Sequence, residues 1–285
     1  MKELVERAAM HLLGSNYAIA LTGAGISTES GIPDFRGPDG IWTKHPEAER
    51  EAYEHYEELL SDPKRHWGKI LEPDSMFSVF DKFIECSPNS GHISLAQLEK
   101  MGILKAIITQ NADALHQKAG SRNVIEYHGS MAKLRCMSCG LRFARDEFDL
   151  QKLRTEGRLP PLCPGCNGVL KIDGVYFREP IPSDSMQQSQ EEAGKCDLML
   201  ICGTSAVVYP FAELPRIARN RMSERGKIIE SSLHAIEWGP ALTIIEINAE
   251  TTPLTYEGVS DYLIQGKTGE VLPCILEEVT RVQKG

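Results

Sequence analysis

The chain of 285 residues is 41% hydrophobic and 25% charged, so it can bury a core large enough for one large or two unequal domains. Its net charge of −9 argues against nucleic-acid binding as the main activity, so we expect no direct contact with nucleic acid, and it leaves basic proteins as acceptable partners. No apolar run approaches the roughly 18 residues of a membrane span, and the first residues do not resemble a secretion signal, so we expect a cytoplasmic protein that does not contact membranes.

The first predicted element is a helix over residues 1–14. Its apolar residues recur at helical spacing, and Gly14 suits a helix C-cap. Apolar runs bounded by turn or helix signals are typical of strands buried in a parallel sheet. Such runs cover residues 17–22, 103–109, 124–127, 198–202 and 243–247. Helical stretches alternate with them, which predicts an α/β fold with a doubly wound, Rossmann-like parallel sheet.

Two stretches interrupt this alternation. Residues 43–70 are charged and helix-like, and residues 131–172 combine short strand-like runs with prolines, glycines and four cysteines. We expect them to form one smaller domain, a helical insertion joined to a cysteine-containing module. The larger domain is then made of residues 1–42, 71–130 and 173–285. Within it, residues 231–241 are expected to form a surface insertion of unknown purpose.

Four of the eight cysteines form two Cys-x-x-Cys pairs. Cys136 and Cys139 are separated by 23 residues from Cys163 and Cys166. Each pair occupies a tight turn that lets two thiolates converge on one ion, so two such turns complete a tetrahedral site and predict one zinc ion. Four protein ligands leave no position for a substrate, so this zinc is expected to be structural. Redox-active dithiols are less favoured, because neither pair opens a helix after a strand.

A Gly-x-Gly turn follows the first predicted strand. Gly23 and Gly25 would let backbone amides approach a pyrophosphate without interference from a Cβ atom. The complete dinucleotide fingerprint requires Gly or Ala at the position of Thr28 and an acidic residue about 20 positions later, and neither is present in usable form. The pattern is therefore either an ordinary glycine turn or a variant dinucleotide site.

The glycine turn belongs to a longer pattern. The run TGAGISTESGIPDFRGPDGIW, residues 22–42, resembles the signature of the sirtuin family of NAD-dependent protein deacylases. Further motifs similar to those of the family follow in the same order over essentially the whole chain. They are TQNADALHQKAG (109–120), HGS (128–130), the two cysteine pairs, GTSAVVYP (203–210), INAETTP (247–253) and GKTGEVLP (266–273). Six ordered motifs are far more specific than one glycine pattern.

The resemblance implies an enzyme that consumes NAD as a co-substrate and acts on an acylated lysine of a protein or peptide. In sirtuin chemistry the amide oxygen of the acyl-lysine attacks the ribose while nicotinamide leaves, and the acyl group ends on ADP-ribose. The catalytic residues that the resemblance implies are His128, Asn111 and Asp113. His128 would be the base, a role typically worth about 10²- to 10⁴-fold in rate.

The same resemblance implies contacts to NAD from most of the ordered motifs. Phe35 would shield the ribose from water, Arg36 would contact the phosphates, and the segment from Gly31 to Gly37 would close over NAD. The implied cofactor-binding residues are Gly23, Ala24, Gly25, Thr28, Asp34, Phe35, Arg36, Trp42, Gln110, Asn111, Asp113, Gly203, Thr204, Ser205, Asn248, Glu250 and Thr268.

Substrate recognition departs from the family pattern at one position. The implied peptide-binding residues are Val175, Phe177, Arg178 and Val208, and Arg178 stands where the family usually has glycine. The Tyr-x-x-Arg sequence that sirtuins use for succinyl and malonyl groups is absent from the chain. We therefore expect removal of acetyl or other uncharged acyl groups.

Three other functions remain as alternatives. An ADP-ribosyltransferase or NAD glycohydrolase is suggested by the arginine in the peptide cleft. A non-catalytic NAD sensor or a zinc-ribbon interaction module is less favoured, because the three implied catalytic residues are present. A dehydrogenase is least favoured, because the dinucleotide fingerprint lacks its acidic residue. The sequence does not determine the oligomeric state.

Overall fold

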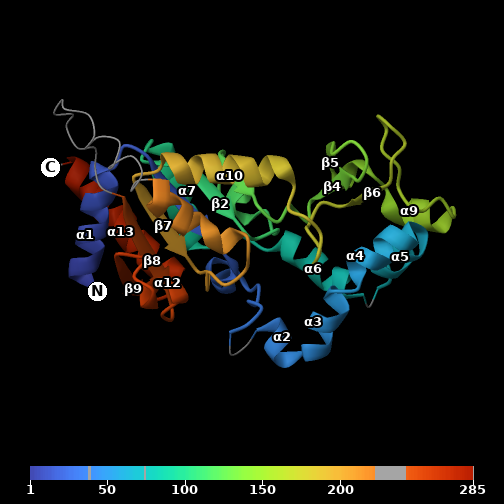
Figure 1. Ribbon diagram of the computed structural model, residues 1–285, viewed down its shortest axis with the longest axis horizontal. Coiled ribbons are helices and arrows are strands. Elements are labelled where there is room, and N and C mark those ends of the chain that lie inside the picture. The colour runs from blue at the N-terminus through green and yellow to red at the C-terminus, as the bar shows by residue number, and fades with distance from the viewer. Residues whose placement is uncertain (38–39, 74, 222–241, 285) are drawn as a thin grey trace.

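The computed structural model describes residues 1–37, 40–73, 75–221 and 242–284, and it is elongated (Figure 1). A six-stranded sheet lies toward one end of the long axis and a three-stranded sheet toward the other. The insertion predicted over residues 231–241 lies outside the described residues. In the described part of the chain, no helix is both long and apolar enough to cross a membrane.

The larger sheet is parallel throughout, and its strand order is β3-β2-β1-β7-β8-β9. Its strands are β1 (Ala18–Thr22), β2 (Leu104–Thr109), β3 (Val124–Glu126), β7 (Leu198–Cys202), β8 (Thr243–Asn248) and β9 (Tyr262–Gln265). The chain moves outward in one direction from β1 to β3 and in the other from β7 to β9. This reversal confirms the doubly wound fold and places the switch point between β1 and β7, where such sheets bind their ligands.

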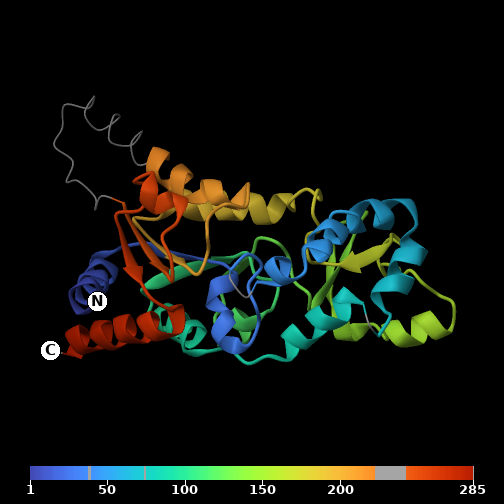
Figure 2. The same cartoon turned by 90° about the horizontal axis from the view of Figure 1, so that it is seen from below.

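Both faces of this sheet are covered by helices, which is why its strands are apolar without alternation. In β1, Ala18 and Ala20 face one hydrophobic cluster, while Ile19 and Leu21 face the other. The first cluster is closed by α1 (Lys2–Gly14), α7 (Ser90–Lys100) and α13 (Thr268–Lys284). The second is closed by α10 (Ser183–Lys195), η4 (Phe211–Glu213) and α12 (Pro253–Tyr256) (Figure 2).

Two details differ from the sequence prediction. Gly14 is the last residue of α1 rather than its C-cap, and Ser15 leaves the helix in an extended conformation. The strand β9 was not predicted, because its four residues at the sheet edge carry a weak apolar signal. The five strands that were predicted agree with the structure to within one residue at each end.

The smaller sheet is antiparallel and joins the two predicted insertions. Its strands are β4 (Lys133–Cys136), β5 (Arg142–Ala144) and β6 (Leu170–Ile172), in the order β5-β4-β6, flanked by η3 (Arg145–Glu147) and α9 (Leu150–Thr155). The helical part contains α2 (Ile41–Lys44), α3 (Pro46–Ala52), α4 (His55–Ser61), α5 (Pro63–Ile70) and α6 (Met76–Glu85).

Trp67 anchors the helical part on the smaller sheet. Its side chain is fully buried, and the indole Nε1 donates a hydrogen bond to the backbone oxygen of Leu170 at 2.8 Å. Leu71 and Phe77 belong to the same hydrophobic cluster although they follow residue 70. The packing of the helical part therefore continues past the predicted boundary, and the exact division of the chain into two domains stays a prediction.

Candidate active site and zinc site

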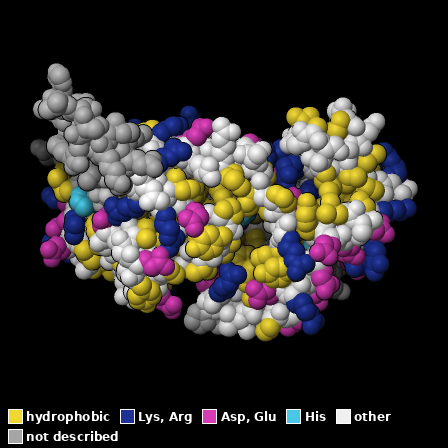
Figure 3. Space-filling view, in the orientation of Figure 1, with side chains coloured by type: hydrophobic (Ala, Val, Ile, Leu, Met, Phe, Trp, Pro, Cys, Tyr) yellow, Lys and Arg dark blue, Asp and Glu magenta, His cyan; other side chains and the backbone are white. Residues whose placement is uncertain are grey.

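The carboxyl ends of the six parallel strands meet at one edge, as they must in a parallel sheet. A cleft of about 650 Å³ lies along this edge and reaches the smaller sheet and its helices. The space-filling view shows a hollow near the middle of the molecule with hydrophobic side chains at its rim (Figure 3). The cleft is lined by every predicted catalytic, cofactor and substrate residue except Gly23.

The glycines of the opening turn serve a purpose that the sequence did not predict. The amide of Gly25 donates to the backbone oxygen of Gly203 at 2.8 Å, and a Cβ atom on Gly25 would lie 2.8 Å from the Cα atom of Gly203. A Cβ atom on Gly23 would lie 2.7 Å from the Cβ atom of Thr204. Close packing of two strand-end loops at the switch point therefore requires these glycines, and contact between Gly23 and the cofactor stays a prediction.

His128 follows β3 and is held in one orientation by the backbone. Its Nδ1 lies 3.2 Å from the carbonyl oxygen of Gln110, so Nδ1 carries the proton and donates to that carbonyl. The other ring nitrogen, Nε2, then has a free lone pair and can accept a proton. Burial lowers the pKa of His128 to about 4, although the Gln110 carbonyl acts in the opposite direction. The imidazole is therefore neutral, as a general base requires.

This low pKa predicts an unusual acid limit for activity. A base with an ordinary histidine pKa of about 6.5 would retain roughly one-tenth of its neutral form at pH 5.5. Because the pKa of His128 is lowered to about 4, its neutral form persists as pH falls and is lost only near pH 4. We expect kcat/KM for NAD at pH 5.5 to exceed half its value at pH 7.5, measured by nicotinamide release. A tenfold decline between these pH values would contradict the expected shift.

The loop after β2 is joined to the opening motif by side-chain hydrogen bonds. The Nδ2 atom of Asn111 donates to the backbone oxygen of Gly23 and to Oγ of Ser27, each at 3.0 Å. The hydroxyl of Ser27 donates to Oδ2 of Asp113 at 2.7 Å. Ser27 was not singled out in the sequence, although it stands inside the opening motif. These bonds fix two of the three predicted catalytic residues relative to the glycine turn.

A row of aromatic rings joins the opening loop to the predicted peptide-binding segment. The ring of Trp42 lies 4.7 Å from that of Phe35 and 5.3 Å from that of Phe177, between centroids. The guanidinium of Arg36 lies 4.6 Å above the Trp42 ring. These contacts give one wall of the cleft a continuous aromatic surface that links its two predicted binding segments.

The segment that carries Val175 and Phe177 is fixed by a buried ionic network. Arg135 contacts Asp173 at 2.8 Å and Glu179 at 2.6 Å, and Lys171 contacts Glu179 at 3.0 Å. The amide of Val175 donates to the carbonyl oxygen of His128 at 2.8 Å. The segment is thus attached to the smaller sheet by charges and to the candidate base by its backbone.

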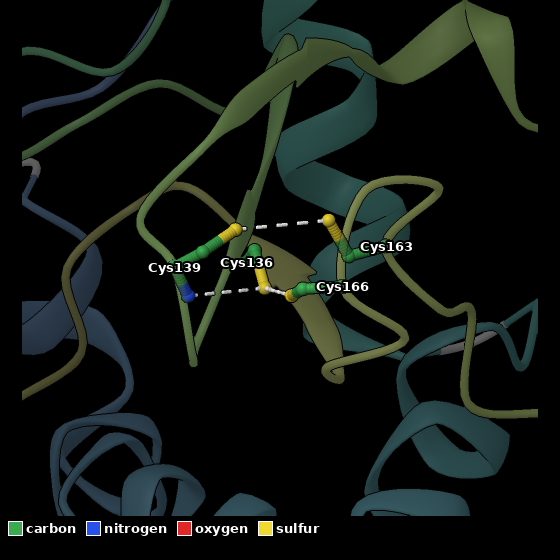
Figure 4. Close-up of side chains that lie close together, drawn as sticks. All are labelled: Cys136, Cys139, Cys163 and Cys166. Carbon is green, nitrogen blue, oxygen red and sulfur yellow. Dashed lines mark hydrogen bonds between the residues drawn. The ribbon is translucent and has the colours of Figure 1, made fainter.

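The four paired cysteines converge at the end of the smaller sheet (Figure 4). The Sγ atoms of Cys136 and Cys166 are 3.5 Å apart, and those of Cys139 and Cys163 are 3.8 Å apart. Tetrahedral zinc with bonds of about 2.3 Å places sulfur atoms about 3.8 Å apart, so this cluster fits one zinc ion. No open coordination position remains, which agrees with a structural role.

Comparisons with known proteins decide the family. The family model described as Sir2 family matches residues 23–210. An NAD-dependent protein deacylase of Pyrococcus furiosus is 41% identical over 273 residues, which are 96% of this chain and 97% of the relative. An NAD-dependent protein deacetylase of Saccharolobus solfataricus is 40% identical over 277 residues, 97% of each chain. The chain belongs to the Sir2 family.

Solved Sir2 structures share the fold of this Sir2 family member. A complex of a Sir2 homologue with NAD aligns with a TM-score of 0.70 at 35% identity and covers 99% of this chain and 94% of that one. A Sir2 enzyme with a deacetylated p53 peptide and 3′-O-acetyl-ADP-ribose aligns with a TM-score of 0.72 at 30% identity and covers 98% of each chain. The family and fold expected from the sequence are confirmed.

The backbone at position 178 of this Sir2 family member has a conformation that suits glycine, the residue expected there from the family pattern. The amide of Glu179 donates to the carbonyl oxygen of Tyr176, which closes a tight turn, and Arg178 has a φ of +66°. Glycine adopts this left-handed conformation without steric cost, whereas other residues are disfavoured there. The Arg178 guanidinium lies 3.0 Å from Glu57, in an exposed ion pair of the kind worth at most about 1 kcal/mol.

The effect of substitutions at position 178 on stability should depend on the backbone conformation rather than on the lost charge. We expect Arg178→Gly to change the free energy of unfolding by less than about 1 kcal/mol, because relief of the left-handed conformation offsets the lost ion pair. Arg178→Val should destabilise by about 1–2 kcal/mol, since a β-branched side chain is least tolerated at positive φ. Glu57→Gln is the control for the ion pair alone. Equal stabilities of Arg178→Val and Arg178→Gly, measured by thermal unfolding, would contradict this explanation.

Proposed function

We propose that this Sir2 family member is an NAD-dependent protein-lysine deacylase that yields nicotinamide, O-acyl-ADP-ribose and free lysine. The observation that carries the proposal is the meeting of a neutral, oriented His128 with the loop of Asn111 and Asp113 in one cleft at the switch point. Relatives that match nearly the full chain at 41% and 40% identity are named NAD-dependent protein deacylase and deacetylase.

The larger sheet supplies the side of the cleft suited to NAD. Gln110 Nε2 donates to Oγ1 of Thr204, and Asn248 Nδ2 donates to the backbone oxygen of Thr204, so the loop after β7 is held from both sides. Thr268 begins α13, and its buried Oγ1 has no hydrogen-bond partner in the described part of the chain. A hydroxyl at the positive end of a long helix fits a phosphate oxygen of the dinucleotide.

Each of the cleft residues has a separate role in the proposed reaction. NAD supplies the ribose electrophile and the nicotinamide leaving group. Asn111 and Asp113 hold the nicotinamide end and a hydroxyl or water, while Phe35 excludes bulk water from the ribose. His128 accepts a proton at Nε2 while Nδ1 continues to donate to the Gln110 carbonyl.

The acylated peptide fits between the segment at Val175 and the loop at Val208, both of which line the cleft. An extended peptide can pair with exposed backbone groups on each side, so affinity comes from main-chain hydrogen bonds and requires little of the flanking sequence. The acyl group would enter the part of the cleft nearest the smaller sheet. Cleft side chains that belong to the hydrophobic cluster of the smaller sheet are Phe77, Met131, Ile172 and Tyr176, and the His55 ring lies beside Phe77 and Tyr176.

This apolar lining predicts the acyl preference. A succinyl carboxylate buried there would lose its hydration without a paired cation, and that loss is expensive. The Arg178 guanidinium does not belong to this lining, because its side chain is largely exposed and lies 3.0 Å from Glu57. We expect kcat/KM for an acetylated peptide to exceed that for the succinylated peptide of the same sequence at least tenfold. Equal turnover of the two peptides, measured by mass spectrometry, would show that the pocket contains an unrecognised anion site.

One assay separates the proposal from its alternatives. Acetylated peptide and NAD are incubated with the protein, and all products are identified by mass. O-acetyl-ADP-ribose together with free lysine supports deacylation, whereas nicotinamide and ADP-ribose without deacetylated peptide support glycohydrolase activity. Peptide that gains the mass of ADP-ribose supports transfer. NAD binding without any product supports the non-catalytic sensor.

We further propose that the substrates are acylated proteins of the cytoplasm. The zinc site requires four thiolates, which persist in a reducing compartment. The net charge of −9 favours basic substrate segments and disfavours direct contact with nucleic acid or anionic membranes.

A further inference from the structure

A second group of metal-ligating side chains lies apart from the four cysteines. His55, Glu58 and His66 each offer one ligand atom, and these three atoms lie within 4.8 Å of one another. His55 and Glu58 are one helical turn apart on α4, and His66 projects from the neighbouring helix α5. None of the three has a role in the proposed deacylation.

Glu58 uses its two carboxylate oxygens differently. Its Oε1 contacts the charged nitrogens of Arg65, at 3.4 Å, and Lys69. Its Oε2 lies 4.0 Å from Nδ1 of His66. The cations therefore hold one oxygen, orient the carboxylate, and leave the other directed toward the imidazoles. Two positive charges beside the carboxylate also weaken any cation site here, which makes Lys69 a useful probe.

The two ring nitrogens of His66 have different surroundings, as they do in a metal-ligating histidine. Its side chain is only 1% exposed, and Nδ1 is buried without a hydrogen-bond partner among the residues that the structure describes. Its Nε2 lies 3.1 Å from the hydroxyl of Tyr176. Metal-ligating histidines usually donate their second N–H to an oxygen, which fixes the ring and leaves the other nitrogen free to coordinate. An unpaired buried nitrogen is costly otherwise, and few native side chains retain one.

We propose that His55, Glu58 and His66 form a second metal site that binds a divalent transition ion such as Zn²⁺ or Co²⁺. Two imidazoles and a carboxylate form a ligand set that selects such ions over Mg²⁺ or Ca²⁺. Bonds of about 2.1 Å in a tetrahedral site place ligand atoms about 3.4 Å apart, so atoms now within 4.8 Å must approach one another by up to about 1.4 Å. Rotation of His55, the more exposed of the two histidines, together with a smaller shift of the Glu58 carboxylate toward His66, would supply this movement.

The site has an open side that faces the cleft. His55 and Tyr176 both line the cleft, whereas His66 is buried and is not among its lining residues. Three protein ligands leave a fourth position for water, unlike the closed site of the four cysteines. The ion would therefore exchange readily with solvent and would be lost to a mild chelator that leaves the cysteine-bound zinc in place.

The test counts metal ions bound to the full-length protein. After dialysis against a mild chelator, the protein should retain one zinc ion per chain and should bind one further equivalent of added Co²⁺. Cobalt at this site should lack the thiolate-to-metal charge-transfer absorption that cysteine-bound cobalt gives. Glu58→Gln and His55→Asn should each lower the affinity for the second equivalent of Co²⁺ at least tenfold, because each removes a ligand. Both variants should still retain one zinc ion per chain.

Two further variants sharpen the result. Lys69→Met removes a competing cation but no ligand, so it should tighten cobalt binding. His45→Ala disrupts the exposed pair with Glu47, whose atoms are 3.3 Å apart, and should leave cobalt binding unchanged. The proposal is overturned if the parent protein binds no second equivalent, or if that equivalent persists in both ligand variants. Because the readout is metal content, the outcome does not depend on whether the deacylase proposal holds.

Discussion

Replacing His128 with alanine is expected to lower kcat for deacylation by about 10²- to 10⁴-fold, the usual contribution of a positioned general base. The variant loses the lone pair of Nε2 and also the hydrogen bond between Nδ1 and the Gln110 carbonyl. His128→Asn separates these effects, because its amide can still donate to the carbonyl while offering no base. Both variants should therefore be inactive to a similar degree, measured as free peptide formed with time.

Binding and integrity must be measured alongside this loss. NAD affinity by calorimetry and one zinc ion per chain should be retained in both variants, since neither depends on the base. His45→Ala, a substitution of an exposed histidine, is the matched control and should keep full activity. Activity within threefold of the parent in His128→Ala would remove His128 from the mechanism. Loss of NAD binding in both variants would instead assign it a structural role.

The fold followed from the sequence because its strands are buried on both faces. A strand such as Leu198–Cys202 must be apolar throughout when helices cover both sides of the sheet, so a continuous apolar run is an informative signal. The edge strand Tyr262–Gln265 has a neighbour on one side only and is partly exposed, so its signal is weak. The first helix ends at Gly14 as predicted, but the C-cap is Ser15, because glycine suits a C-cap and is also tolerated as a final helical residue.

The site was predictable only where chemistry is encoded in short motifs. The four cysteines could be placed from spacing alone, and the cleft residues through the ordered Sir2 motifs. The hydroxyl of Ser27 could not, because its hydrogen bonds join segments more than 80 residues apart. The packing of Gly25 against Gly203 was missed for the same reason. At position 178 the sequence showed that arginine replaces the expected glycine, but only the structure showed that this residue has a positive φ.

The smaller sheet depends on the zinc ion far more than the larger sheet does. Three strands of three or four residues are marginal by themselves, and Cys136 and Cys163 are themselves buried in the hydrophobic cluster around Trp67. Structural zinc sites contribute roughly 10–16 kcal/mol of apparent binding free energy, which is coupled to folding. The two clusters of the larger sheet contain none of the zinc ligands.

Cys163→Ser is therefore expected to abolish zinc binding and unfold the smaller sheet while the six-stranded sheet remains folded. Hydrogen exchange should accelerate sharply in residues 131–173 and little in β1 or β7. Deacylation should also be lost, because Lys171 and Arg135 of the smaller sheet hold Glu179 and with it the peptide-binding segment. Cys274→Ser, at an exposed cysteine on α13, is the control and should change none of these. Full peptide turnover by zinc-free protein would show that the segment at Val175 is positioned without the smaller sheet.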